Sequence, residues 1–481
     1  MANINRRSFI KSTALTAAAV GLPARSWARI LGANDDIRAA VVGFNGRGRD
    51  HLRGLSGLPG VRITALCDVD SRILEAEVKR FKDKNQPVEG FTDMRKLLEC
   101  KDVEVVTFAT PNHWHSLGAI WAIQAGKDVY LEKPVSHNVS EGRRVVEFAR
   151  KHNRIVQVGT QSRSSLTGIK EAVAWVRAGN LGKILVSRGL CYKRRDSIDK
   201  VDGPQPIPSE IDYELWCGPA LKLPLTRKRL HYDWHWVWNT GNGDLGNQGI
   251  HEMDVARWFL GVNELAPRVF SVGGRVGYID DGETPNTQVI FQDYPTAPLI
   301  FEVRGLPSKT GAREMDSYKG AGVGNVVECE GGYVTVPNYT SAVAFDNNGQ
   351  QIKDFKGSES HYANFIKAVR SRKHTDLNAD ILEGHLSSAL CHTGNISYLL
   401  GSQKSPDEIR EAIKGNKDTA EAFGRMGEHL AANGVDVTKD KLTLGLMLKM
   451  GPKTERFIGN AKANELLTRP YRPGFVVPDK A

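Results

Sequence analysis

The residues best placed to do chemistry lie in one short stretch, residues 130–134, with the sequence YLEKP. The apolar segment 128–131 predicts a short buried strand, which puts Glu132 and Lys133 at the carboxyl end of that strand. In an open α/β sheet, ligands lie outside the carboxyl ends of the strands. A lysine at this position can therefore meet both a cofactor and a substrate. The alternative is a solvent-exposed Glu-Lys pair that simply follows a strand.

A second motif is the glycine turn 43–48, which follows an apolar strand at 39–42 and precedes a helix predicted over 49–58. A further predicted strand, 61–67, ends in Asp68. This arrangement is typical of a dinucleotide site, because glycines let the backbone approach the pyrophosphate while helix amides face its charge. The candidate cofactor-binding residues of the turn are Gly43, Asn45, Gly46, Arg47 and Gly48.

Two residues refine this nucleotide site. The carboxylate of Asp68 can accept hydrogen bonds from ribose hydroxyls and would repel a 2′-phosphate, which predicts NAD rather than NADP. Asn45 stands where the G-x-G-x-x-G pattern has its middle glycine. Asparagine adopts left-handed backbone more readily than most residues, so we expect the turn to form despite this departure.

The elements around these motifs predict two kinds of sheet. Up to about residue 165, strands and helices alternate, which indicates a doubly wound parallel sheet. The expected helices lie at 72–82, 94–100, 113–125 and 138–151, and the expected strands include 103–109 and 155–159. After a helix at 169–178, strands predominate at 184–187, 268–277, 288–291, 299–303, 326–329, 333–336 and 342–345. Such a succession indicates an antiparallel sheet, and helices at 362–370 and 379–400 follow it.

The N-terminus has the features of an export leader. Arg6 and Arg7 are followed by a modestly apolar run and by a small-x-small cleavage site at 26–28. The pattern indicates a twin-arginine signal peptide over residues 1–28, recognised by the twin-arginine export machinery, which carries proteins already folded around a cofactor. We therefore expect a periplasmic or extracytoplasmic protein that is exported folded; the alternative is a disordered basic N-terminus.

Composition excludes several other classes. Removing the four cations of the leader lowers the formal net charge from +10 to +6, and the remaining basic residues are scattered among acids, which does not predict nucleic-acid binding. No apolar run reaches the roughly 20 residues that a membrane span needs, so we expect no membrane association of the mature chain. The six cysteines are widely spaced without a Cys-x-x-Cys pair, which argues against a zinc ribbon or a redox motif.

Taken together, the glycine turn, Asp68, the segments 110–115 and 132–134, and the segment 243–251 resemble the Gfo/Idh/MocA oxidoreductases. The resemblance covers roughly residues 36–400. It implies an N-terminal Rossmann NAD-binding domain (36–165) and a C-terminal α+β substrate-binding domain with a large, mainly antiparallel open sheet (166–400). Residues 401–481 form a C-terminal extension outside it. Members of the family commonly form dimers or tetramers, so we expect a homo-oligomer.

The resemblance also assigns roles to individual residues. Lys133 would lie near the nicotinamide and hold the reacting hydroxyl, and His251 would be the acid or base that takes its proton. Further residues would line the cofactor: Thr110, Asn112, His115, Glu132 and Gln161. Four positions before the histidine, the family often has an aspartate, where this chain has Asn247. An amide cannot raise the basicity of a histidine as a carboxylate does, so Asp244 or Asp254 would have to compensate.

The aromatic segment 231–238 is a candidate sugar cleft. Its tryptophans can stack on sugar C–H faces while imidazoles meet hydroxyls, although a buried aromatic core is the simpler alternative. Substrate-binding candidates are His231, Trp234 and His235, together with Asp244. The two histidines are spaced i, i+4 as zinc ligands can be, but they lack an H-E-x-x-H pattern, so we expect no metal.

Export constrains the reaction, because the periplasm offers no NAD pool for exchange. We therefore expect tightly bound NAD and hydride transfer at a secondary hydroxyl of a sugar or sugar derivative. One alternative is a redox-neutral glycoside hydrolase that oxidises, eliminates, adds water and reduces again. An ordinary dehydrogenase with an unknown electron acceptor is another. A non-catalytic carbohydrate-binding protein is a hypothesis of a different class, whereas a twin-carboxylate glycosidase fits poorly because no paired acid motif is present.

Overall fold

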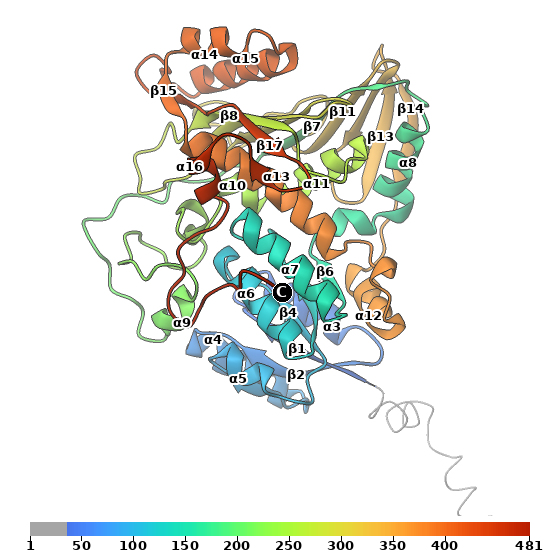
Figure 1. Cartoon of the computed structure of the whole chain (residues 1–481), viewed down its shortest axis with the longest axis vertical. Helices are drawn as coiled ribbons and strands as arrows, with labels where there is room; N and C mark the ends of the chain where they lie inside the picture. Colours follow the sequence, from blue (N-terminus) through green and yellow to red (C-terminus); the bar gives the residue numbers. More distant parts are fainter. Residues whose placement is uncertain (1–35) are drawn as a thin grey trace, which may run out of the picture.

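The computed structural model describes residues 36–481 as two sheet-based halves that share a central group of helices (Figure 1). The leader predicted over residues 1–28 lies outside the described residues. Within residues 36–481, no helix is both long and apolar enough to cross a membrane. The two halves meet where α7 (Val139–Lys151) of the first half packs against α13 (Ile381–Leu399) of the second.

The first half is a six-stranded parallel sheet with the order β3-β2-β1-β4-β5-β6. Its strands are β1 (Ile37–Val42), β2 (Val61–Cys67), β3 (Glu89–Phe91), β4 (Val105–Phe108), β5 (Asp128–Leu131) and β6 (Val156–Val158). Its helices are α3 (Gly48–Ser56), α4 (Ser71–Asp83), α5 (Met94–Leu98), α6 (Asn112–Gln124) and α7 (Val139–Lys151). The strand order reverses between β1 and β4, so the carboxyl ends of these strands form the switch point at which doubly wound sheets bind ligands. The predicted fold of this half is confirmed.

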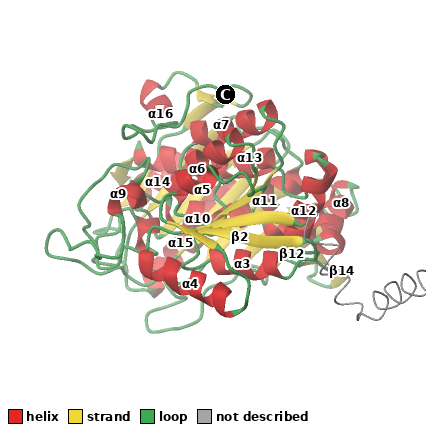
Figure 2. Ribbon diagram, turned by 90° about the horizontal axis from the view of Figure 1, so that it is seen from below, coloured by secondary structure: helices red, strands yellow, loops and turns green. Residues whose placement is uncertain are grey.

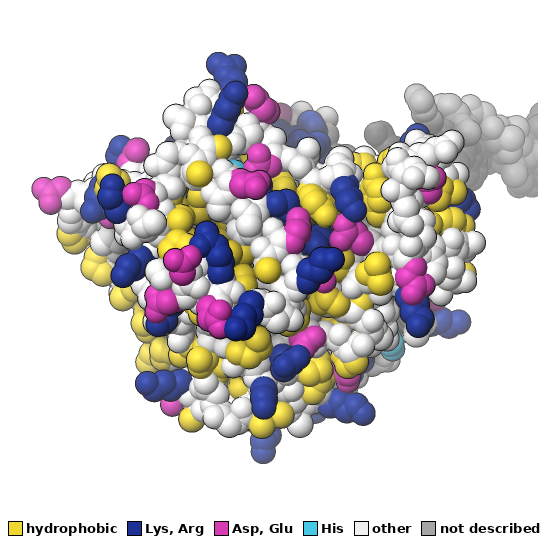
Figure 3. Space-filling view, turned by 90° about the horizontal axis from the view of Figure 1, so that it is seen from above, with side chains coloured by type: hydrophobic (Ala, Val, Ile, Leu, Met, Phe, Trp, Pro, Cys, Tyr) yellow, Lys and Arg dark blue, Asp and Glu magenta, His cyan; other side chains and the backbone are white. Residues whose placement is uncertain are grey.

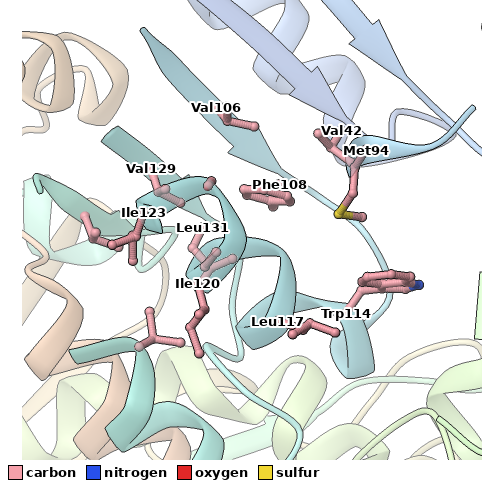
Figure 4. Close-up of a cluster of buried hydrophobic side chains, with 14 of the residues drawn as sticks. Val42, Met94, Val106, Phe108, Trp114, Leu117, Ile120, Ile123, Val129 and Leu131 are labelled. Carbon is pink, nitrogen blue, oxygen red and sulfur yellow. The ribbon is translucent and has the colours of Figure 1, made fainter. Parts of the chain in front are cut away.

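Helix α6 anchors this sheet through an unusually apolar surface (Figure 4). Leu117, Ile120 and Ile123 are fully buried in the same core cluster as the side chains of β4 and β5. At Gly118 a Cβ atom would lie 2.8 Å from the ring of Phe108, so the helix approaches the strand closely only because this residue is glycine. The helix begins directly after the turn 110–111 and thereby holds that turn at the switch point.

The second half is a mixed, mostly antiparallel sheet with the order β14-β13-β12-β11-β7-β10-β9-β8-β16-β15. Only β7 and β10 pair in parallel among these neighbours. The strands are β7 (Ile184–Tyr192), β8 (Arg268–Gly274), β9 (Thr287–Asp293), β10 (Leu299–Arg304), β11 (Val323–Cys329), β12 (Gly332–Val336), β13 (Ser341–Asp346), β14 (Gln351–Lys356), β15 (Ser402–Lys404) and β16 (Leu442–Leu444). The predicted large, mainly antiparallel sheet is confirmed.

Helices cover this sheet from both sides, and Figure 2 shows how helices and strands are layered. The helices of this part of the chain are α8 (Glu171–Arg177), α9 (Tyr213–Cys217), α10 (Gly243–Asn247), α11 (Gly249–Leu260), α12 (His361–Ser371), α13 (Ile381–Leu399), α14 (Pro406–Ile413), α15 (Lys417–Ala432) and α16 (Ala461–Glu465). Of these, α12 packs against the parallel sheet instead. Helices α11 and α13 pack on the face that looks toward the parallel sheet, whereas α14 and α15 lie on the opposite side (Figure 1). The short strands β17 (Leu448–Gly451) and β18 (Arg456–Phe457) pair with each other beside β8.

The sequence pattern did not predict the strands β3, β14, β15, β16, β17 and β18. Strand β3 has three residues, and β14 is an edge strand whose side chains are mostly exposed and polar, so neither shows an apolar signal. The start of α7 carries only half of a capping box. Asn138 accepts the N–H of Glu141 at 3.0 Å, but the Glu141 carboxylate accepts the N–H of His137 instead of that of Asn138.

The C-terminal extension is built into both halves. Strands β15 and β16 lengthen the large sheet, and Phe423 and Met426 of α15 join a buried cluster on its outer side. The chain then returns to the parallel sheet, where the ring of Phe475 lies 5.7 Å from Trp114 and 6.3 Å from Trp121 of α6. Figure 1 shows the C-terminus beside α6 and α7. The final segment therefore links the two halves.

The surface carries mixed charge. On the face shown in Figure 3, Lys and Arg side chains are interspersed with Asp and Glu. Several surface ion pairs lie along a helix, such as Arg410 with Asp407 in α14 and Lys79 with Asp83 in α4. Exposed pairs of this kind contribute little stability.

Replacing Phe475 with alanine should lower the free energy of unfolding by about 3 kcal/mol, because a buried aromatic ring is lost from between two tryptophans. Urea denaturation of the mature protein measures this difference. The neighbouring Val476→Ala is the control, since Val476 is 55% exposed and should change stability little. Equal effects of the two substitutions would contradict the contact.

Candidate active site

The glycine turn after β1 presents backbone to the switch point. Gly43 has a φ of 76°, and a Cβ atom on Gly48 would lie 2.0 Å from the carbonyl oxygen of Gly43. Both glycines are therefore required by the turn itself. A Cβ atom on Gly46 would meet nothing within 4 Å, because Gly46 borders a cavity. Asn45 does not have a positive φ, so the turn forms without a glycine at that position.

The surroundings of this turn fit a dinucleotide. No side chain caps the N-terminus of α3, which leaves its first amide groups available to an anion. Asp68, at the end of β2, accepts the N–H of Phe44 at 3.0 Å and that of Asp70 at 3.1 Å. Burial raises the pKa of Asp68, and these two amide bonds oppose the rise. The carboxylate is thus fixed beside the turn, where ribose hydroxyls would lie in an NAD-binding Rossmann domain.

Glu132 is the centre of a buried ion-pair network at the same edge. Its Oε1 accepts hydrogen bonds from Nε of Arg47 at 2.8 Å and lies 3.1 Å from Nε2 of His51. Burial alone would raise the pKa of Glu132, but the His51 contact and the Arg47 charge outweigh burial and hold it well below its usual range. The charged glutamate therefore ties the glycine turn to the end of β5.

Lys133 connects the two halves of the molecule. Its Nζ donates to the backbone oxygen of Asn247 at the end of α10, at 3.1 Å. Burial lowers the pKa of Lys133, and the neighbouring Glu132 charge partly restores it. A lysine whose ammonium form is weakly held can exchange a proton with a substrate hydroxyl.

The turn between β4 and α6 forms the floor of the site. His115 contacts two carbonyl oxygens, that of Pro134 at 2.5 Å and that of Thr110 at 2.8 Å. Asn112 donates to the side chain of Asn242 at 3.1 Å. The hydroxyl of Thr110 is buried and has no hydrogen-bond partner, which suits a group that awaits a ligand.

His251 lies in the first turn of α11, with the centre of its ring 4.8 Å from that of Tyr339 and the two rings tilted by 38°. Its Nδ1 is buried without a hydrogen-bond partner. Burial, and next the charge of Lys133, hold the pKa of His251 well below its usual range. The ring is therefore neutral at pH 7 and can accept a proton, as a general base must.

The two aspartates considered as substitutes for a carboxylate at position 247 are engaged elsewhere. Asp244 forms a two-pronged ion pair with Arg195, at 2.7 and 2.8 Å. Asp254 is paired in the same way with Arg163, at 2.7 and 2.9 Å. Both carboxylates are thus satisfied by guanidinium groups that are themselves largely buried.

The aromatic insert is the segment between β7 and α10, residues 193–242. It forms the wall of the site opposite the glycine turn. Its backbone docks on the parallel sheet, since Ser71 N donates to Glu210 O at 2.9 Å and Asp212 N donates to Val69 O at 3.1 Å. The His231 ring contacts the Asp70 carboxylate at 3.2 Å.

Farther along the insert, the rings of Trp234 and His235 stack 3.6 Å apart. Burial lowers the pKa of His235 to about 3, so its ring is neutral. Within residues 36–481, no cluster of three or more His, Cys, Asp or Glu side chains is arranged to hold a metal ion.

These elements enclose one cavity of about 360 Å³. The predicted site residues that line it are Gly43, Asn45, Gly46, Arg47, Asp68, Thr110, Asn112, His115, Glu132, Lys133, His231, Trp234, His235 and Asn247. Four predicted residues stand outside this lining: Gly48, Gln161, Asp244 and His251. Of these, Gly48 supports the glycine turn. His251 does not line the cavity, but it lies close enough to Lys133 for the lysine charge to lower its pKa.

Several residues of the site were missed from the sequence. His51 supports Glu132 from within α3, and Trp216 lines the cavity from α9. Gln248 and Glu252 flank His251 and are both buried. Only the i, i+4 spacing between Gln248 and Glu252 gives a signal in the sequence, and that spacing does not show burial.

Comparison with known proteins defines the class of this protein. The model described as "Oxidoreductase family, NAD-binding Rossmann fold" matches residues 37–160, and "Oxidoreductase family, C-terminal alpha/beta domain" matches residues 168–290. The chain belongs to the Gfo/Idh/MocA oxidoreductase family. A twin-arginine translocation signal sequence matches residues 3–23, which indicates export across a membrane.

Curated relatives match only part of this chain. Inositol 2-dehydrogenase of Salmonella typhimurium is 29% identical over 181 residues, which cover 37% of this chain and 52% of the relative. Glycosyl hydrolase family 109 protein 2 of a Shewanella species (strain ANA-3) is 32% identical over 163 residues, or 29% of this chain and 36% of the relative. The matches therefore span about half or less of these relatives.

Solved structures resemble more of the chain. The WlbA dehydrogenase from Bordetella pertussis, in complex with NADH and UDP-GlcNAcA, has a TM-score of 0.54 and 18% identity, covering 74% of this chain and 94% of its own. An oxidoreductase from Agrobacterium radiobacter in complex with NAD⁺, L-tartaric acid and magnesium has a TM-score of 0.53 and 15% identity, covering 75% and 95%. At these identities the likeness shows a shared fold.

Two glycine substitutions should separate the contribution of the glycine turn to stability from its contribution to nucleotide binding. Gly46→Ala should leave the unfolding midpoint unchanged but reduce bound nucleotide, because its methyl group enters the open space that borders the turn. Gly48→Ala should destabilise the fold as well, because its methyl group meets the Gly43 carbonyl. Thermal denaturation and the nucleotide released on denaturation measure the two effects. Full nucleotide content in Gly46→Ala would contradict this placement.

Proposed function

We propose that this protein is an exported, NAD-dependent oxidoreductase that acts at a secondary hydroxyl of a sugar or sugar derivative. The observation that carries the proposal is the shared cavity. The glycine turn and Asp68 line one side of it, and Lys133, Trp234 and His235 line another. A dinucleotide and a polyhydroxy substrate can therefore meet at the lysine.

Tight retention of the cofactor is part of the proposal. The insert docks on both sides of Asp70 through Val69 and Ser71, and its His231 contacts the Asp70 side chain. A nucleotide seated on the glycine turn would thus be covered by a segment that has to detach before release. Asp68 favours NAD over NADP, since its carboxylate would repel a 2′-phosphate. Retention also suits the periplasm, the compartment that we propose from the export signal.

The chain's own residues supply the proton chemistry. NAD held at the glycine turn and Asp68 would supply an acceptor for the hydride of the substrate carbon, and could return that hydride in a redox-neutral cycle. Lys133 holds the substrate oxygen and stabilises the negative charge that develops as the hydroxyl loses its proton. His251 is neutral and takes that proton, directly or through water. The buried walls exclude bulk water, which strengthens both interactions.

A redox-neutral glycosidase is the second candidate, favoured by the relatives named glycosyl hydrolase family 109 proteins. In this cycle a sugar is oxidised at C3, which acidifies the proton on C2. The C2 proton and the glycosidic leaving group then depart, water adds to the double bond, and the ketone is reduced again. The sum is hydrolysis without net redox change, so no electron acceptor is needed.

Assembly remains a separate prediction. We retain the expectation of a homo-oligomer from the family, and the structure limits how one can form. Helices α14 and α15 cover the outer side of the sheet near β8, β9 and β10. An assembly through the open sheet would therefore use the part near β12 to β14.

The function is tested by incubating the exported protein, without added nucleotide, with aryl and natural glycosides in deuterated water. Released sugar carrying deuterium at C2 identifies the redox-neutral cycle. A change in reduced-nicotinamide absorbance without release identifies a dehydrogenase that awaits a second substrate. If neither occurs while sugar still binds, the oxidoreductase proposal is wrong and a carbohydrate-binding protein is indicated.

Substitution of Lys133 by methionine should lower kcat about 10²- to 10⁴-fold, because the oxygen of the substrate loses its charged partner. The nucleotide content should stay close to that of the wild type. Lys193→Met provides a control with a nearby cation that does not line the cavity, and we expect a much smaller loss. Comparable losses in both variants would show that Lys133 has no special role.

A further inference from the structure

The short helix α9 forms part of the wall of the cavity. Leu215 and Trp216 of α9 line the cavity, which the glycine turn and Asp68 also border. A nucleotide on the glycine turn would therefore lie beside α9, and movement of this helix would open the cavity. Because α9 has only five residues, its own hydrogen bonds cannot keep it in place. Its position depends on contacts with its neighbours.

Helix α6 supplies one set of these contacts. Nε1 of Trp114 donates to the backbone oxygen of Leu215 at 2.9 Å and lies 3.1 Å from that of Trp216. Nε2 of His113 also lies 2.9 Å from the backbone oxygen of Trp216. A Cβ atom on Gly218 would lie 2.2 Å from the Trp114 ring, so the end of α9 rests directly on that ring.

The C-terminal segment, residues 467–477, supplies the other set (Figure 1). Nη1 of Arg472 donates to the backbone oxygens of Glu214 and Gly218, at 3.1 and 3.2 Å. The same guanidinium is ion-paired with the Glu214 carboxylate, and the Arg472 side chain is only 13% exposed. It lies 5.1 Å from the ring centre of Phe475, which packs against Trp114. Arg472 thus holds both ends of α9 through charge-assisted hydrogen bonds.

A second arginine of the C-terminal segment fastens the aromatic insert nearby. Nη2 of Arg469 donates to the backbone oxygen of Asn239 at 2.9 Å and to its Oδ1 at 2.8 Å. Asn239 exchanges two hydrogen bonds with the backbone of Leu221, in the loop that follows α9. The segment itself is attached to α7, because the Tyr471 hydroxyl donates to Glu141 at 3.1 Å.

We propose that the C-terminal segment retains the cofactor, because Arg472 holds α9 against the cavity and thereby limits how fast bound NAD leaves. Arg472 is a positioning residue, since it acts through α9 and does not line the cavity. The inference rests on the proposed function for the presence of bound NAD. It assigns part of the retention to residues outside the two segments that match the family, 37–160 and 168–290.

The rate of nucleotide release tests this role. The purified protein is diluted into charcoal, which removes free nucleotide, and timed samples are denatured to count the nucleotide that remains bound. Arg472→Met keeps a long side chain beside Phe475 but has no N–H donors, so release should be about 10- to 100-fold faster than in the wild type. Glu214→Gln should give a smaller acceleration and covers a failure of Arg472→Met to fold, since Glu214 is half exposed. Wild-type release rates in these variants would overturn the proposal.

Two controls separate this role from a general loss of stability. Arg370→Met removes another guanidinium that donates to a backbone oxygen, that of Gly60 at 3.0 Å, but it leaves the aromatic insert untouched. Met426→Ala lowers stability from the buried cluster on the outer side of the large sheet. Both controls should release nucleotide at the wild-type rate. If Met426→Ala releases it as fast as Arg472→Met, release follows global stability and the proposal is wrong.

Hydrogen exchange gives a readout that does not depend on release. The amides of Trp216 and Gly218 are hydrogen-bonded within the turn that α9 forms, so their exchange reports opening of this helix. With excess NAD added to both proteins, residues 213–218 should exchange faster in Arg472→Met than in the wild type, whereas α4 should not change. Equal exchange of residues 213–218 would contradict the hold of Arg472 on α9.

The two proposals fail in different ways. A wild-type protein that carries no nucleotide and binds no added NAD overturns the proposed function and the retention role together. A wild-type protein that carries NAD, but releases it no more slowly than Arg472→Met, overturns the retention role alone.

Discussion

The site depends on the hydrogen bond between Nζ of Lys133 and the backbone oxygen of Asn247, at 3.1 Å. Lys133 belongs to the parallel sheet and Asn247 to the helices of the large sheet, so this contact sets the distance between the two binding walls. The buried, charged Glu132 fixes the lysine from one side by pairing with Arg47 and His51. Removing Lys133 from water makes its proton labile, and that lability is useful for chemistry on a hydroxyl.

Two further segments close the cleft around this contact. The aromatic insert docks on the strand end at Asp70, and the C-terminal segment packs Phe475 against α6. Both cross from the large sheet to the parallel sheet, which favours a closed arrangement over independent motion of the halves. A cleft closed in this way suits the cofactor retention that we propose.

Much of this organisation follows from the sequence. The bounds of β5 coincide with the predicted strand 128–131, because a buried parallel strand reads as a continuous apolar run. The glycine turn, Asp68 and Lys133 were predicted to meet, since parallel strands bring their carboxyl ends together.

Other features could not be read in this way. The sequence around Asp244 does not indicate that Arg195 is its ion-pair partner. Nor does a single sequence indicate that Glu252 is buried with one carboxyl oxygen lacking a hydrogen-bond partner. The first contact arises only when the segment after β7 packs beside α10, and the burial of Glu252 arises only when α11 packs on β7. The central claim is tested most directly by denaturing the mature protein, purified from the exported fraction and extensively dialysed, and by identifying the nucleotide released. The account predicts about one NAD per chain; a protein that carries no nucleotide, or carries NADP instead, would contradict it.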